Sequence, residues 1–176
     1  MVADEIRISI EENPYYVWHL KGITPIKKKK LDIHKSKTIF GALSIKTGKV
    51  IYHISEKQNG KEAVNLLDKV KKFKDKLYMR SKKKILFIWD NASSHKNKEV
   101  RDWLKENPNQ IELDNFPPYS PEFNPIEHVW KILKSDINYL RGQSTLTEII
   151  YKAEEFLDTN SFNYELLGVS KSRIFK

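Results

Sequence analysis

Residues 85–89, Ile-Leu-Phe-Ile-Trp, form a continuous apolar run that decides the fold class of this chain. The run is bounded by Lys84 and Asp90, and its length is that of a strand rather than a helix. Short apolar runs of this kind are typical of strands that are buried on both faces, as in a parallel sheet. We therefore expect residues 85–89 to be a buried strand in a sheet that contains parallel pairs.

The sequence before this run indicates antiparallel strands. Apolar and polar residues alternate over residues 5–10, which predicts a half-buried strand. Two further strands are expected over residues 38–45 and 50–55, on either side of a Lys-Thr-Gly-Lys connection. This connection predicts a hairpin with Gly48 in the left-handed conformation.

Helices and one more strand complete the predicted pattern. Apolar residues at helical spacing and the residues that end each segment predict helices over about 61–79 and 96–106 and from Asn124 to Gly142. Thr145 and Glu148 have the spacing of a capping box, which predicts a last helix from Thr145 onward. A further strand is expected over residues 111–116. The order of these elements predicts an α/β fold, with three antiparallel strands followed by two parallel strands in one mixed sheet flanked by helices.

The length of 176 residues suits a single domain. We expect this domain to span residues 1–160, with a C-terminal tail over 161–176. The absence of cysteine excludes disulfides, zinc fingers and other thiolate metal sites. The sequence shows neither a signal peptide nor the ~20 consecutive apolar residues of a membrane-spanning helix, so we expect an intracellular, cytoplasmic protein.

The chain is strongly basic, with a net charge of +9. Its lysines cluster in three runs, at residues 27–30, 69–76 and 82–84. We expect the lysines of the second run to lie on the solvent-facing side of the predicted helix over about 61–79. Such runs attract polyanions, which makes nucleic acid a candidate partner. A solvated lysine-rich surface without a partner is the alternative. If nucleic acid binds, the candidate phosphate contacts are Lys27, Lys28, Lys29 and Lys30.

Two acidic residues have positions that suit a functional site. Asp90 directly follows the apolar run, and ligands of open α/β sheets bind beyond the carboxyl ends of the strands. The alternative for Asp90 is an ordinary Asp-Asn turn. Glu127 lies in the first turn of a predicted helix, where a glutamate also serves as a capping residue. We expect the side chain of Asn124 to cap this helix and thereby to direct the Glu127 carboxylate.

The surroundings of these two acids resemble catalytic motifs of DDE transposases. Residues 90–95 (DNASSH) and 117–131 (PPYSPEFNPIEHVWK) are similar to the second and third motifs of the mariner-like superfamily, in its bacterial and archaeal insertion-sequence branch. Thirty-six residues separate Asp90 from Glu127 (127 − 90 − 1 = 36), close to the usual spacing of that branch. Weaker similarity around Asp4, Trp18 and residues 39–44 extends the resemblance over most of residues 1–142.

This resemblance implies a ribonuclease-H-like fold and a metal-dependent polynucleotidyl transferase. It implies that Asp4, Asp90 and Glu127 are the catalytic, metal-binding carboxylates. A surface acid is the alternative for Asp4. Asn91 and His95 are candidate supporting residues, with a capped turn as the alternative, and Asn124 supports the site through its helix.

Carboxylates without cysteine or histidine ligands suit Mg²⁺ or Mn²⁺, and two such ions can clamp a phosphodiester. The resemblance implies that the substrate is double-stranded DNA, namely the terminal inverted repeats of the element and its target site. Related enzymes act as dimers, so a homodimer or pairing with a full-length transposase is expected. Only three residues precede Asp4, so we expect this chain to lack the N-terminal helix-turn-helix DNA-binding region.

Two other functions keep the same fold. One is a ribonuclease-H-like nuclease that hydrolyses RNA–DNA hybrids or DNA junctions with the same carboxylates. The other is an inactive or domesticated remnant that only binds DNA. A serine or cysteine hydrolase and a P-loop enzyme are unsupported, because neither motif occurs in the sequence.

Overall fold

The computed structural model describes residues 1–10, 21–22, 35–77, 83–89, 97–117, 124–138 and 144–163. The strands in these ranges are β1 (Val2–Ser9), β2 (Ser36–Leu43), β3 (Val50–Ser55), β4 (Ile85–Trp89) and β5 (Ile111–Asn115). The helices are α1 (Gly60–Leu77), α2 (Lys98–Glu106), α3 (Ile126–Ile137) and α4 (Leu146–Thr159). None of the helices in the described ranges is long and apolar enough to cross a membrane.

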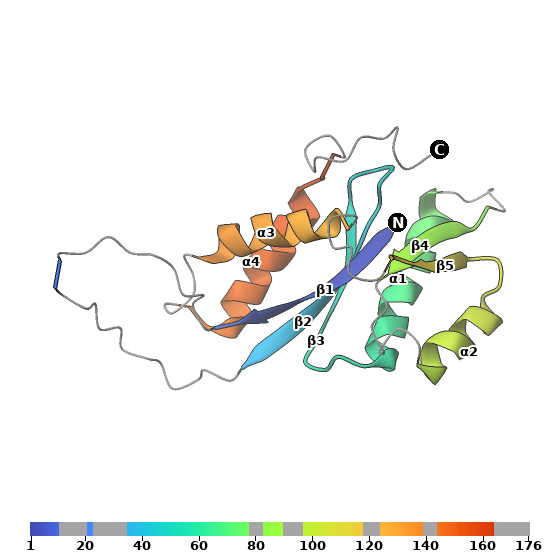
Figure 1. Cartoon of the computed structure of the whole chain (residues 1–176), viewed down its shortest axis with the longest axis horizontal. Helices are drawn as coiled ribbons and strands as arrows, with labels where there is room; N and C mark the ends of the chain where they lie inside the picture. Colours follow the sequence, from blue (N-terminus) through green and yellow to red (C-terminus); the bar gives the residue numbers. More distant parts are fainter. Residues whose placement is uncertain are drawn as a thin grey trace.

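The strands form one sheet in the order β3-β2-β1-β4-β5 (Figure 1). The pairs β1–β2 and β2–β3 are antiparallel, whereas β1–β4 and β4–β5 are parallel. The predicted mixed sheet is therefore confirmed. The predicted hairpin is also confirmed, since β2 pairs with β3 and Gly48 adopts a φ of 71° between them. Strand β1 lies in the middle of the sheet, where the antiparallel part meets the parallel part.

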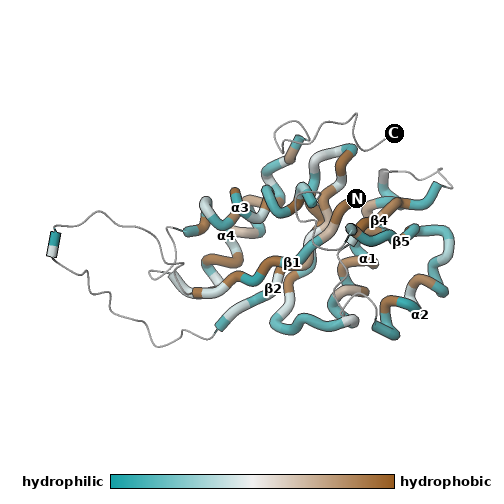
Figure 2. Tube along the Cα trace, viewed as in Figure 1, coloured by the Kyte–Doolittle hydropathy of each residue, from teal (hydrophilic) through white to brown (hydrophobic). Residues whose placement is uncertain are grey.

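Helices cover both faces of the sheet (Figure 1). Because side chains alternate along a strand, β1 and β2 supply both cores. Helices α3 and α4 pack on one face, over a core that includes Ile6, Ile8 and Ile39. Helices α1 and α2 pack on the other face, over a core that includes Phe40 and Trp89. Figure 2 shows that apolar residues recur along the strands and at intervals along the helices, as two packed layers require.

Strand β4 differs from the prediction that it would be buried on both faces. Phe87 and Trp89 are fully buried under α1 and α2, but the side chain of Leu86 is 49% exposed. Leu86 points to the opposite face, together with Ile88, which packs against the edge of the α3 and α4 core. Those two helices pack mainly over β1, β2 and β3, and they leave part of β4 uncovered.

Two lysines of the run at 69–76 are structural rather than free surface charges. The side chain of Lys74 is only 5% exposed, and its Nζ donates hydrogen bonds to the Asn109 carbonyl and to Gln110 Oε1. Lys71 Nζ donates to Asn107 Oδ1. Both lysines therefore attach α1 to the connection between α2 and β5, and the expectation that this run faces solvent is wrong at Lys74.

The segment after α4 returns to the sheet. Phe162 is buried in the core with α3 and α4, and its ring lies against Phe156. Its backbone N–H donates to the carbonyl of Gly48 across 2.7 Å. Residues 161–163 therefore stabilise the β2–β3 hairpin, immediately after the predicted end of the domain at residue 160.

Candidate active site

Asp4 lies within β1, because this strand begins at Val2 rather than at the predicted residue 5. The even-numbered residues of β1 face α3 and α4, since Val2, Ile6 and Ile8 belong to that core. Asp4 shares their face by the alternation of side chains. It is partly buried, and its partner across the antiparallel ladder is Gly41 of β2.

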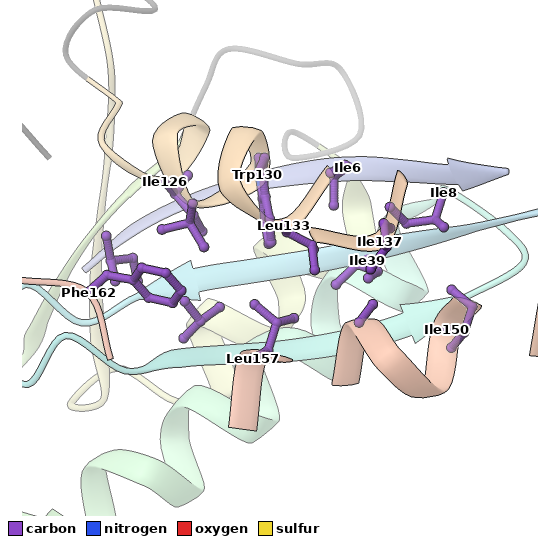
Figure 3. Close-up of a cluster of buried hydrophobic side chains, with 14 of the residues drawn as sticks. Ile6, Ile8, Ile39, Ile126, Trp130, Leu133, Ile137, Ile150, Leu157 and Phe162 are labelled. Carbon is purple, nitrogen blue, oxygen red and sulfur yellow. The ribbon is translucent and has the colours of Figure 1, made fainter. Parts of the chain in front are cut away.

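Trp130 of α3 reaches Asp4 directly. Its indole Nε1 donates a hydrogen bond to Asp4 Oδ2 across 3.1 Å. Figure 3 shows Trp130 projecting from α3 toward the sheet, between Ile126 and Leu133. Trp130 is buried, and only 5% of it is exposed. Its hydrogen bond to Asp4 was not predicted; the available signal was Gly41, because a glycine inside a strand often marks a close approach.

Asn124 makes a second connection between the start of α3 and β1. Its Nδ2 donates to the carbonyl of Ala3 across 3.5 Å, and its own backbone carbonyl accepts from the Glu127 N–H. The prediction that the Asn124 side chain caps α3 is wrong, because Pro125 occupies the N-cap position and no side-chain cap bond forms. The Asn124 amide is used in tertiary contact instead. It is 5% exposed, and no described residue donates to its Oδ1.

Glu127 is exposed in the first turn of α3. It stands three positions after Asn124 and three before Trp130, and both of these residues bond to the Ala3–Asp4 segment. The first turn of α3 is thereby held against β1 at the position of Asp4. The structure thus places the start of α3, which carries Glu127, against the part of β1 that carries Asp4.

Several predicted site residues lie outside the described residues, namely Asp90, Asn91, His95, Lys27, Lys28, Lys29 and Lys30. Asp90 follows Trp89, the last residue of β4. In the parallel pairing of β1 with β4, Val2 is opposite Ile88. Among the described residues, no group of three histidine, cysteine, aspartate or glutamate side chains could hold a metal ion. Two of the three predicted carboxylates, Asp4 and Glu127, fall within that part of the chain.

Comparison of the sequence with known families gives a match to the DDE superfamily endonucleases over residues 1–150. The chain is 30% identical over 163 residues to the "Insertion element IS630 uncharacterized 39 kDa protein" of Shigella sonnei, which covers 90% of this chain and 44% of that protein. It is 34% identical over 97 residues to the "Transposable element Tc3 transposase" of Caenorhabditis elegans, and this match covers 54% of this chain and 28% of that protein. The chain thus spans less than half the length of these relatives.

Solved structures of Mos1 transposase share the fold. The pre-cleavage Mos1 transpososome has a TM-score of 0.66 at 19% identity, covering 95% of this chain and 50% of that one. The catalytic domain of Mos1 mariner transposase has a TM-score of 0.62 at 17% identity, covering 95% and 73%. The ribonuclease-H-like fold implied by the motifs is confirmed by this likeness. The family match takes in β1 with Asp4 and α3 with Glu127, and it covers most of the sequence, so the chain belongs to the DDE superfamily endonucleases.

Proposed function

We propose that this chain is the catalytic domain of a transposase, which cuts DNA at the ends of its element and joins those ends to target DNA with divalent metal ions. The metal-binding carboxylates are Asp4, Asp90 and Glu127. The observation that carries the proposal is the double attachment of α3 to β1, through Asn124 to Ala3 and through Trp130 to Asp4. This attachment supports Glu127 and Asp4 as members of one site.

The register of the two parallel strands supports the inclusion of Asp90. Val2 of β1 is paired with Ile88 of β4. Asp4 follows Val2 by two positions, and in the sequence Asp90 follows Ile88 by two positions; β1 and β4 run in the same direction. Residues that lie the same number of positions beyond a pair of partners in parallel strands are expected to lie near each other, which favours Asp4 and Asp90 as neighbours. Ligands of such sheets bind beyond the carboxyl ends of the strands, where Asp90 follows β4 in the sequence.

The side chains suit the proposed metal. Carboxylate oxygens are hard ligands that favour Mg²⁺ or Mn²⁺, and the chain has no cysteine that would favour a softer metal. Two bound ions would supply activation of the attacking water or 3′-hydroxyl and stabilisation of the leaving oxygen. The task of the protein is to hold the carboxylate oxygens in place. Mos1 complexes have been solved with Mn and with Mg, which supports the same choice of metals here.

DNA is the proposed substrate. The net charge of +9 favours binding to a polyanion, and Lys27, Lys28, Lys29 and Lys30 are the proposed phosphate contacts. Asn91 and His95 are proposed to support the site from the segment after Asp90. Mos1 has been solved in a paired-end complex with its left transposon end, which supports transposon-end DNA and a paired assembly for this chain.

Nicking of a supercoiled plasmid in Mn²⁺ tests the proposal. We expect the wild-type chain to convert the plasmid to open circles, and Asp4→Asn, Asp90→Asn and Glu127→Gln each to abolish the conversion. Glu112→Gln is the matched control, because Glu112 is an exposed acid on β5 and should leave nicking unchanged. Nicking that persists in Asp90→Asn would contradict the assignment.

The same preparations separate the two other functions. A nuclease predicts cleavage of an RNA–DNA hybrid by the wild-type chain without joining of labelled 3′ ends to target plasmid. A DNA-binding remnant predicts retention of a labelled duplex by both wild type and Asp90→Asn, with no cleavage in either metal. Metal-dependent joining of 3′ ends would support the transposase alone.

A further inference from the structure

We infer that Trp130 is a positioning residue of the metal site: its indole N–H sets the direction of the Asp4 carboxylate and links it to the helix that carries Glu127. The inference rests on the proposed function, because it concerns the same carboxylates. It assigns Trp130 no contact with substrate or metal. The indole acts only through Asp4.

The hydrogen bond has the chemistry of an orienting contact. An indole nitrogen can only donate, and a carboxylate can only accept when ionised, so the direction of the bond is fixed. The bond joins Trp130 Nε1 to Asp4 Oδ2 across 3.1 Å, where Trp130 is buried and Asp4 partly buried. Bonds to an ionised acceptor are stronger than neutral ones and hold one carboxylate oxygen in a defined direction. Contacts of this type tune how well a carboxylate binds metal.

Gly41 allows the indole to reach this position. An ideal Cβ built on Gly41 would lie 2.4 Å from Trp130 Cη2 and 2.6 Å from Cζ2, closer than carbon atoms can approach. Gly41 is also the cross-strand partner of Asp4. The residue opposite Asp4 in β2 is thus a glycine, and the Trp130 ring lies over it on its way to Asp4.

Trp130 also couples the two acids mechanically. It follows Glu127 by three residues in α3, so both lie on neighbouring positions of one helix surface. A shift of α3 along β1 would move Glu127 and break the bond from Trp130 to Asp4 together. The bond therefore favours the helix position in which Glu127 and Asp4 belong to one site.

The chain contains a matched control. Trp103 of α2 is 6% exposed, close to the 5% of Trp130, and its Nε1 donates to Asp68 Oδ1 across 2.7 Å. This pair lies under the other face of the sheet, with α1 and α2. Trp103→Phe and Trp130→Phe thus remove the same kind of bond from the same depth, and only one of them touches the proposed site.

Mn²⁺ binding to the full chain, measured from the free-ion signal in electron paramagnetic resonance, tests the inference. We expect Trp130→Phe to weaken Mn²⁺ binding by about 10-fold, the lower end of the range for residues that support metal ligands. Trp103→Phe should leave it unchanged. Asp4→Asn should weaken binding more than Trp130→Phe does. If Trp130→Phe binds Mn²⁺ with wild-type affinity while Asp4→Asn binds it more weakly, the positioning role of Trp130 is wrong and the proposed function is unaffected.

If wild type and Asp4→Asn bind Mn²⁺ equally, or neither binds it, both the proposed function and the positioning role fail. A second measurement avoids variants of Trp130, in case the phenylalanine variant does not fold. In ¹⁵N-labelled protein, Asp4→Asn should shift the indole N–H resonance of Trp130 and leave that of Trp103 in place. Addition of Mg²⁺ to wild type should move the Trp130 resonance as well. If the indole N–H resonance of Trp130 shifts neither in Asp4→Asn nor on addition of Mg²⁺, the inference is wrong.

Discussion

The ring of Trp130 occupies the space that a side chain at Gly41 would fill. An ideal Cβ on Gly41 would lie 2.4 Å from Trp130 Cη2 and 2.6 Å from Trp130 Cζ2. Because Asp4 pairs with Gly41 and accepts the indole N–H, these three residues form one unit of contact across β1, β2 and α3. The glycine is thus required by a packing partner more than 80 residues away in sequence.

Gly41→Ala should destabilise the fold by about 1–3 kcal/mol, the usual cost of overpacking a core. The free energy of unfolding, from urea titration, measures this cost. In a Trp130→Phe background the cost should fall, because phenylalanine lacks the outer part of the indole that meets the new methyl group. Residues in contact give such non-additive effects. Equal costs in both backgrounds would show that the indole is not the obstacle.

Thr145→Ala should cost about 0.5–2 kcal/mol of stability, because it removes a helix cap. Thr145 Oγ1 accepts the Glu148 N–H across 3.3 Å, and Glu148 Oε2 accepts the Thr145 N–H across 2.7 Å. This capping box begins α4, the helix that packs beside α3. Thr145→Ser keeps the hydroxyl and serves as the control in thermal unfolding. A serine variant as unstable as the alanine variant would locate the effect in the lost methyl group instead of the cap.

Local sequence patterns predicted the elements whose cause is local. The capping box of Thr145 and Glu148 and the left-handed Gly48 follow from residues within a few positions of each other, and both are confirmed. The order of antiparallel and parallel strands also followed from the pattern. Motif resemblance, rather than periodicity, brought Asp4 into the predicted site, since an acid near the start of a strand has no local signature of function.

Features that depend on distant partners were not predictable from local patterns. Asn124 has the sequence of a helix cap, but its amide bonds to Ala3, which lies 121 residues away. The apolar run of β4 could not indicate that α3 and α4 leave Leu86 half exposed. Lys74 resembles its charged neighbours in sequence, yet the turn before β5 buries it. In each case a tertiary partner overrode the local signal.

Acid should remove a contribution of Glu62 to stability. His53 Nε2 bonds to Glu62 Oε2 across 2.6 Å, and Asn65 Nδ2 donates to the same oxygen across 3.0 Å. The hydrogen bond from His53 is the largest influence and lowers the pKa of Glu62; partial burial opposes it, and Asn65 and Ser55 add to it. The folded state therefore binds this proton less readily than the unfolded state. The contribution is fully present above the ordinary glutamate pKa of about 4.3 and is lost as pH falls through the lower folded value.

Comparison of variants isolates this contribution from the other carboxylates. Urea unfolding of wild type and Glu62→Gln, repeated from pH 7 to pH 3, should give a stability difference that shrinks with acid. Glu56→Gln removes an exposed glutamate just before α1 and should show no such pH-dependent difference. A wild-type advantage over Glu62→Gln that stays constant to pH 3 would contradict the lowered pKa.

Glu127→Gln should separate activity from stability. Glu127 is exposed in the first turn of α3, and the side chain of the residue at the N-cap position makes no capping bond. The change should therefore alter the free energy of unfolding by no more than about 0.5 kcal/mol. Metal-dependent plasmid nicking should fall by at least about 100-fold, since loss of residues that merely support a metal ligand costs up to that factor.

Glu127→Asp shortens the side chain by one methylene while keeping the charge, and partial activity in a tenfold excess of Mn²⁺ is expected if the carboxylate holds an ion. Full nicking activity in Glu127→Gln would show that Glu127 does not belong to the site. A large loss of stability in the same variant would show that the Glu127 side chain caps the helix.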